Sequence, residues 1–499
     1  MKIITLPLII SSLVVSGCAV QLKPFTQEEN QARVLQDISA LFQDQEPITA
    51  PLTLNDAIAR ALKYNLDHRL KLMEDAVAMG QLDVANINLL PAVVANLGAR
   101  VRNNADSTFN EDKTLTSTSS DRDARTADLS VSWNVLDFAI GYVRAHQQAD
   151  MALMVQERRR SVIHSIVNDT RRAYWRAVAA ERALQGLEPM LRETHKALNQ
   201  AQVRIDELVG APLDALTYQQ DLLLTIRELE TRHRQLVEAR TELAVLLNTH
   251  PGTPFTLADA TVAPTAVMGL ELPINTQDLE LIALQNRSEL RAEAYQLRLN
   301  QREAKVALLE MIPGLNFTTG INYTSDSFKV NSDWYDASLN LSWNIMNLFK
   351  GPTRQRLVET KTELSNVRRL ALSMAVISQV NIAQLRFQHA RADYELTNRL
   401  ASVQDQIAQR LTAGTQAKTV GEARRIQGEV SALLSNLQRD MAYADMQSAF
   451  GSIFASIGAD PLPTEVEDDS IEALSLAVGA VQDQWRQGHY ASPEPVRID

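Results

Sequence analysis

Four short stretches of alternating apolar and polar residues place the strongest constraint on the fold of this chain. In ASLNLSWNIMN (337–347), Leu339, Leu341 and Trp343 alternate with serine and asparagine. Alternation with a period of two is typical of a β-strand with two different faces. We therefore expect strands of about ten residues at 93–102, 128–136, 315–324 and 335–346.

Strands of this length, apolar on one face and polar on the other, match those of an outer-membrane β-barrel. Trp133, Trp343, Tyr323 and Tyr335 then fit the aromatic girdles at the membrane surfaces. Four strands cannot close a barrel, and unpaired backbone groups in lipid each cost several kcal/mol. Other copies must therefore complete it, and three copies would supply twelve strands. The alternative is a soluble sandwich whose apolar face packs on a helix.

Most of the remaining chain is expected to be helical, because 499 residues contain only 18 Gly and 17 Pro. At 1.5 Å per residue, a helix over 139–208 would be about 100 Å long, too long for a compact domain. Its regularly spaced charges favour coiled-coil packing over several shorter helices in an ordinary bundle. The expected helices are 55–91, 139–208, 212–247, 277–311, 352–411 and 416–457.

The sequence contains an internal duplication. ALKYNLDHR (61–69) matches ALQNRSELR (283–291), and LSVSWNVLDF (129–138) matches LNLSWNIMNLF (339–349). We therefore expect two copies of a helix, β-hairpin and long-helix unit. The expected divisions are a first repeat at 52–250, a Pro- and Thr-rich linker at 251–275, a second repeat at 276–458 and a C-terminal tail at 459–499.

The first 17 residues have the pattern of a signal peptide, with Lys2 followed by a short apolar run and small residues. Cys18 is the only cysteine, so no intramolecular disulfide can form. LVVSGC resembles the lipobox of bacterial lipoproteins, which implies that Cys18 carries lipid such as palmitate and begins the segment 18–51. Ala19 then favours sorting to the outer membrane. A free cysteine in an ordinary signal peptide is the alternative. No later segment reaches 18 consecutive apolar residues, so no transmembrane helix is expected.

These features together, with LTLNDAIARALKYNLD (52–67), resemble the TolC family of outer-membrane efflux proteins. The resemblance covers 52–458. It implies a mainly α fold with a small β part and a homotrimer. The trimer forms a 12-stranded transmembrane β-barrel continuous with a periplasmic α-helical barrel. It also implies an outer-membrane location with a lipid anchor, and two partners: a periplasmic adaptor protein and an inner-membrane pump.

The same resemblance points to two groups of site residues. The small residues Val209, Gly210 and Ala211, and likewise Ala413, Gly414 and Thr415, resemble the tip motifs that bind adaptor hairpins. Asp214 and Glu422 fall near the family's acidic pore gate, although Lys418 beside them does not suit an acidic ring. Plain helix turns and solvated helix charges are the alternatives.

No motif suggests an enzyme, a cofactor or a metal site. The chain has no HExxH, GxSxG, GxGxxG or GxxxxGK pattern. A net charge of −11 argues against nucleic acid as a partner. We expect a passive exit duct for small molecules, driven by a partner pump. The alternatives are the outlet of a type I protein-secretion system and a lipid-anchored periplasmic coiled-coil scaffold without a pore.

Overall fold

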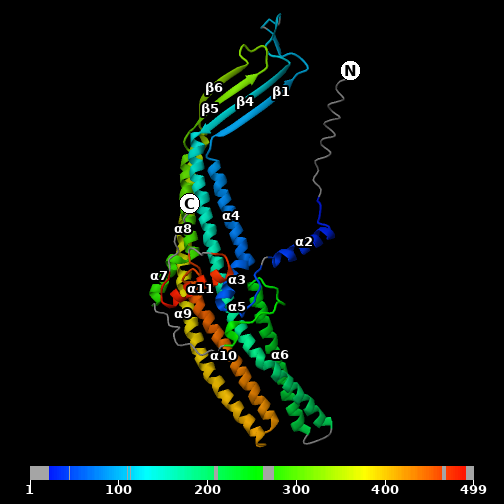
Figure 1. The fold of residues 1–499 in the computed structure, drawn as a ribbon. Helices are drawn as coiled ribbons and strands as arrows, with labels where there is room; N and C mark the ends of the chain where they lie inside the picture. Colours follow the sequence, from blue (N-terminus) through cyan, green and yellow to red (C-terminus); the bar gives the residue numbers. More distant parts are fainter. Residues whose placement is uncertain are drawn as a thin grey trace.

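The structure is a computed structural model, in which a β-sheet caps one end of a long array of helices (Figure 1). It describes residues 22–43, 45–109, 111–112, 114–206, 212–261, 275–463 and 468–490. The signal peptide, Cys18, the motif at 209–211 and most of the linker lie outside the described residues.

The sheet has four antiparallel strands in the order β1-β4-β5-β6, so the two repeats meet where β4 pairs with β5. Its strands are β1 (Ala92–Val101), β4 (Asp123–Asn134), β5 (Gly314–Thr324) and β6 (Asp333–Ser342). All four predicted strands are present. The prediction was wrong about the end of β6, because α9 (Met346–Gln416) begins shortly after it and leaves Trp343 between the two.

A second small sheet extends the loop between β1 and β4. It is formed by β2 (Ser107–Phe109) and β3 (Thr116–Thr118). These two short strands lie outside the four strands that the sequence predicts. The corresponding connection in the second repeat, between β5 and β6, is shorter.

The helices of the two repeats match in length. α3 (Leu54–Tyr64) and α7 (Thr276–Asn286) have 11 residues each, and α4 (Leu66–Ile87) and α8 (Ser288–Leu309) have 22 each. α5 (Val135–Asp206) has 72 residues and α9 has 71, while α6 (Pro212–Leu246) and α10 (Glu422–Ser456) have 35 each. The two halves of the chain therefore repeat the same order of helices with nearly equal lengths.

Each helix predicted before a hairpin is in fact two helices. α3 begins with a capping box, in which Thr53 and Asp56 bond to each other's backbone N–H groups, so the helix starts at Leu54, one residue before the predicted start at 55. At Asn65 the backbone is extended (φ −62°, ψ 128°), and its side chain caps α4 by accepting bonds from Asp67 and His68. Arg287 interrupts the second repeat with nearly the same backbone angles.

The long helices form a wall one helix thick. Beside the sheet its order is α4-α5-α8-α9, and in the other half it is α6-α5-α10-α9. The single long helices α5 and α9 therefore run through both halves, as the length argument predicted. The lateral edges of the wall are α4 and α6 on one side and α9 on the other.

At mid-length, short helices cover one face of this wall (Figure 1). They are α3, α7 and α11 (Ile471–Arg486), the last of which packs on α3. Tyr174 of α5 is fully buried in this belt, where its hydroxyl donates to Asp259 Oδ2 over 2.6 Å. Trp485 of α11 stacks on Phe454 of α10 with ring centroids 4.7 Å apart. The belt therefore joins both repeats on one side of the wall.

Candidate functional site

The strand register places the four apolar faces on one side of the sheet. Val131 lies opposite both Val93 and Thr319, and Phe317 lies opposite Leu339. The other side carries polar side chains in the same register, such as Asn316 opposite Asn340 and Ser132 opposite Thr318. The predicted facing of the strands is confirmed across the whole sheet.

No described residue of the chain covers the apolar face. Leu339 is 65% exposed and Leu341 is 71% exposed. In β5 the apolar side chains Leu315, Phe317 and Ile321 are exposed, whereas the intervening polar positions Asn316 and Thr318 are half-buried. A water-soluble sheet has the opposite arrangement. The sandwich alternative, in which a helix covers this face, is not what the structure contains.

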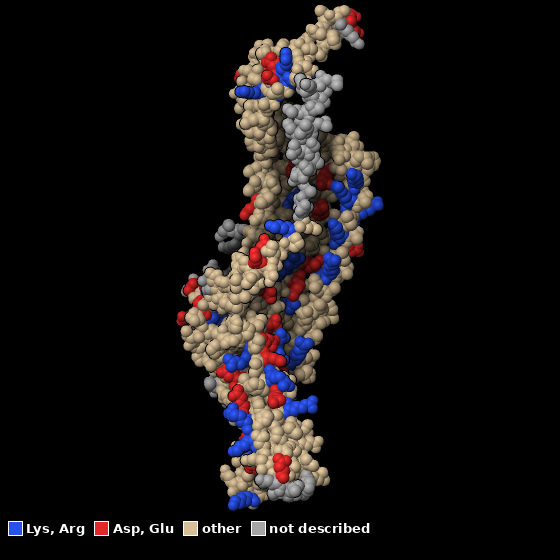
Figure 2. Space-filling model, turned by 90° about the vertical axis from the view of Figure 1, so that its right-hand side faces the viewer, with Lys and Arg blue, Asp and Glu red and all other residues tan. Residues whose placement is uncertain are grey.

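Charge and aromatic residues divide the sheet along its length. In Figure 2, charged side chains gather at the loop end of the sheet and along the helices, with an almost uncharged surface between them. Tyr323 and Tyr335 lie toward the loop end, paired with Asp333 and Ile321. Trp133 and Trp343 lie at the helix end, where Trp343 Nε1 donates to Met311 O over 3.0 Å. An apolar band with an aromatic rim at each end is typical of a membrane-spanning barrel wall.

Both lateral edges of the molecule are open. β1 and β6 each have one neighbour in the sheet, so each presents unpaired backbone groups on its outer side. Below β1, exposed apolar side chains follow α4 at helical spacing: Leu66, Leu70, Met73, Val77, Val84 and Ile87. Below β6, a similar stripe follows α9: Leu364, Val367, Met374, Leu385, Leu396, Leu400, Val403 and Ile407. Such stripes are typical of helices that pack on another helix.

The apolar stripe also bears on the expectation that the chain has no transmembrane helix. Among the described residues, α9 alone contains an 18-residue stretch apolar enough to cross a membrane by length and composition. The helix is 71 residues long, and one of its faces is buried against α10 by residues such as Val380 and Phe387. Its apolar character is explained by two packing faces, one within the chain and one at the open edge.

The turn between α9 and α10 lies farther along the chain than predicted. Ala413, Gly414 and Thr415 belong to the last turn of α9, which continues to Gln416. The residue with positive φ is Lys418 (φ 59°), not a glycine. The Gly414 carbonyl accepts bonds from Thr419 N and Val420 N and so closes the helix end. The motif therefore lies beside the tip, and the turn itself is formed by 417–421.

The two predicted gate residues differ in their surroundings. Asp214 is exposed in the first turn of α6, where a carboxylate suits the positive end of the helix dipole. Glu422 lies in the first turn of α10 and accepts a bond from Arg425 Nε over 3.2 Å. Hydrogen bonds from Arg425 hold the pKa of Glu422 below its usual 4.5. The structure thus pairs Glu422 with a cation of its own chain, and no contact joins it to Asp214 among the described residues.

Arg425 is the residue that the sequence analysis missed. Its guanidinium is only 13% exposed and pairs with Glu193 of α5 as well as with Glu422 and Glu429 of α10. Glu429 also accepts a bond from Thr412 Oγ1 of α9 over 2.8 Å. The cluster therefore joins three helices near the tip. The i, i+3 and i, i+4 spacing of Glu422, Arg425 and Glu429 was visible in the sequence, but the partner on α5 was not.

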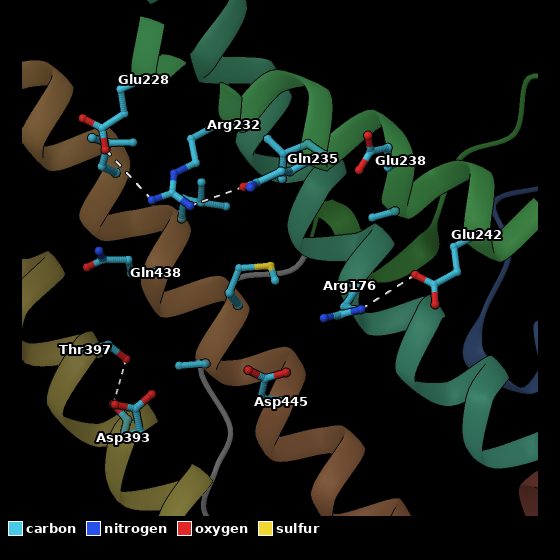
Figure 3. A pocket seen from close by; sticks show the side chains of 16 residues that line it. Arg176, Glu228, Arg232, Gln235, Glu238, Glu242, Asp393, Thr397, Gln438 and Asp445 are labelled. Atoms are coloured by element: carbon cyan, nitrogen blue, oxygen red, sulfur yellow. Dashed lines mark hydrogen bonds and ion pairs between the residues drawn. The ribbon is translucent and has the colours of Figure 1, made fainter. Parts of the chain in front are cut away.

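A pocket of about 930 Å³ is lined by side chains of α5, α6, α9 and α10 (Figure 3). Arg176 of α5 lines it, whereas Tyr174, two residues earlier and so on the other side of the helix, is buried in the belt. The pocket holds five carboxylates and two guanidinium groups: Glu228, Glu238, Glu242, Asp393, Asp445, Arg176 and Arg232. Burial raises the pKa of Asp445, Arg176 opposes the shift, and Asp393 adds to it. The pocket therefore carries an excess of acidic groups and lies on the side of α5 away from Tyr174.

Within the described ranges, no three His, Cys, Asp or Glu side chains gather as metal ligands would. The features that set this chain apart are a two-faced sheet, two open edges and a polar helical wall.

Comparison with known proteins identifies the fold. No family model and no curated protein matches the sequence. Among solved structures, the Campylobacter jejuni CmeC outer membrane channel is 12% identical with a TM-score of 0.65, over 89% of this chain and 94% of that one. CusC, whose structures are reported to follow its folding and transmembrane channel formation, is 17% identical with a TM-score of 0.62, over 84% of this chain and 96% of that one. The Neisseria gonorrhoeae MtrE outer membrane channel, in its open state, is 14% identical with a TM-score of 0.61, over 81% and 88%.

These similar structures are channels rather than enzymes, and they match nearly their full lengths to this chain. At such identities the likeness establishes the fold. The chain therefore has the fold of the TolC-family outer-membrane channels, as the resemblance of its sequence had predicted.

Proposed function

We propose that this protein is the outer-membrane exit duct of a tripartite efflux system. The observation that carries the proposal is the sheet, whose uncovered apolar face suits lipid and whose polar face suits water. A periplasmic scaffold without a pore would have no use for such a face.

The open edges suggest how the duct is completed. In a ring of three copies, β6 of one chain pairs with β1 of the next, and the α9 stripe packs on the neighbouring α4 and α6. The sheet then closes as a twelve-stranded barrel with no edge in lipid. The belt lies outside the ring, and the polar face with its acidic pocket lines the interior. Small molecules cross by diffusion through this wet interior.

Energy must come from a partner, and we propose that a periplasmic adaptor and an inner-membrane pump supply it. The tips that would meet the adaptor include Val209, Gly210, Ala211, Ala413, Gly414 and Thr415. Asp214 and Glu422 are proposed as residues of the pore gate. The Arg425 cluster is proposed to hold the tip closed, because it ties α10 to α5.

Conductance in planar bilayers tests the pore directly. The purified detergent-extracted protein should form discrete channels, with cations favoured over anions because of the acidic interior. A protein that inserts into the bilayer but conducts no ions even when its tip is open would contradict a duct and favour the scaffold without a pore.

Replacing Gly414 with valine should impair efflux at a normal outer-membrane level. A Cβ atom at Gly414 would lie 2.6 Å from Val420 Cγ2 and 3.3 Å from Val420 Cβ, so Val420 or the turn that carries it must shift. The measurement is the resistance of a strain that depends on this duct, with protein levels from membrane fractions. Gly421→Ala is the matched control, because a Cβ atom there meets nothing within 4 Å. Equal resistance in both strains would remove the role of Gly414 at the tip.

Acid should loosen the tip. The pKa of Glu422 is lowered from 4.5 by its bonds with Arg425, so this pairing stabilises the folded tip above pH 4.5. The stabilisation is lost as the pH falls through the lowered pKa. Channel opening should therefore increase below pH 4.5, and Glu422→Gln should reduce that increase. A pH response that is unchanged in Glu422→Gln would assign it to another group.

Changing Cys18 to serine should abolish lipid attachment, because the thiol is the proposed acceptor. Metabolic labelling with a radioactive or clickable fatty acid measures this directly. Labelling that persists in the variant would contradict a lipid anchor at Cys18.

A further inference from the structure

Helix α2 (Gln27–Leu41) is amphipathic but buries nothing against its own chain. None of its residues is buried. Val34, Leu35, Ile38 and Leu41 share one side of the helix, and they are 46%, 64%, 55% and 36% exposed. Figure 1 shows α2 standing apart from the helical wall.

The sequence specifies this helix locally. Thr26 and Glu29 form a capping box, with Glu29 N donating to Thr26 Oγ1 over 3.2 Å and Thr26 N donating to Glu29 Oε2 over 2.8 Å. A 15-residue helix is nevertheless marginal in water without tertiary packing. Its apolar side therefore needs a partner surface.

The base of α2 is fixed at an open edge of the molecule. Asn248, just beyond the end of α6, donates from Nδ2 to Leu41 O over 2.9 Å. Gln45 Nε2 donates to Asn248 O over 2.6 Å, and the Phe42 ring meets His250 edge to face at 5.7 Å. Because α6 is an edge helix, α2 extends from the boundary where a neighbouring chain would begin.

We propose that the apolar side of α2 docks on the neighbouring copy of this chain and clasps the ring from outside. The proposal rests on the proposed function, since the ring is what brings a second copy to the α6 edge. The neighbour would present its α9 edge there, with α7 packed on α9 at belt level. Leu281 of α7, outside the α9 stripe, is 58% exposed and offers an apolar surface to this helix face.

A membrane surface fits α2 less well. Helices that lie on anionic lipid have polar faces rich in Lys and Arg. The polar residues of α2 include Glu28, Glu29 and Asp37 against the single cation Arg33. The charge of α2 therefore favours a protein partner.

Site-specific photo-crosslinking in the full-length protein tests the proposal. A benzophenone amino acid replaces Leu35 on the apolar side, or Gln36 on the opposite side as the matched control, and membranes are irradiated. Light should produce a two-chain product from the Leu35 position that survives boiling in detergent, and none from Gln36. A product within one chain, an adduct with lipid, or equal two-chain yields at both positions would overturn the proposal.

Unirradiated samples of both variants separate the two levels of the argument. If they remain oligomeric but Leu35 links only within its own chain, the clasp is wrong and the duct stands. If they are monomeric, the ring is wrong as well.

Discussion

Replacing Leu339 with arginine should abolish insertion of this protein as a stable oligomer. Leu339 is 65% exposed on the apolar face and lies midway along β6 between Tyr335 and Trp343, near the expected centre of the bilayer. An arginine facing lipid at the midplane costs about 2–4 kcal/mol per chain, and three chains share the barrel. The measurement is the amount of heat-resistant oligomer in outer-membrane fractions.

The matched control is Asn340→Arg, one residue along the same strand. Asn340 lies opposite Asn316 on the polar face, so the new cation would lie in the aqueous interior. The oligomer should form at near-normal yield and conduct with altered ion selectivity. Equal yields of the two variants would contradict the facing of the sheet.

Replacing Arg425 with alanine should open the periplasmic tip. The largely buried guanidinium joins Glu193, Glu422 and Glu429, so its loss leaves three carboxylates close together without a cation. Removing one partner of a fully buried ion pair costs about 3–5 kcal/mol of stability. Because the three carboxylates are partly exposed, we expect the closed tip to lose only about 2–3 kcal/mol per chain. Repulsion between α5 and α10 should raise the open fraction of single channels and make cells sensitive to large antibiotics.

Arg424→Ala controls for the change in net charge. Arg424 is exposed on the same turn of α10. The conductance of the Arg424→Ala channel should remain that of the unaltered protein. An Arg425→Ala channel that stays closed, or an Arg424→Ala channel that opens equally, would contradict the assignment of Arg425.

The sequence sufficed for the parts of the fold that depend on local patterns. Alternation located all four strands and their apolar sides, because a strand with two different faces repeats every two residues. The long helices followed from the absence of breakers between Tyr142 and Gln185. The pairing of β4 with β5, which joins the two repeats, depends on contacts between distant segments and was not predicted.

The helix breaks at 65 and 287 and the turn at the tip were harder to predict from the sequence, for physical reasons. Asn65 is a favoured N-cap residue, but Arg287 at the equivalent break is an ordinary helix former without a side-chain cap bond, and it interrupts the helix only through its extended backbone. Glycine suggested a turn at Gly414, but the left-handed position is occupied by Lys418, a side chain that rarely accepts it. In the sequence Arg425 resembles any surface cation of a helix, because its partner Glu193 lies on α5, far away along the chain.

The most direct test of the account is the native mass of the detergent-extracted protein. Because each chain supplies four strands with two open edges, the account predicts a complex of three chains. A single chain, stable after the detergent is removed, would contradict it.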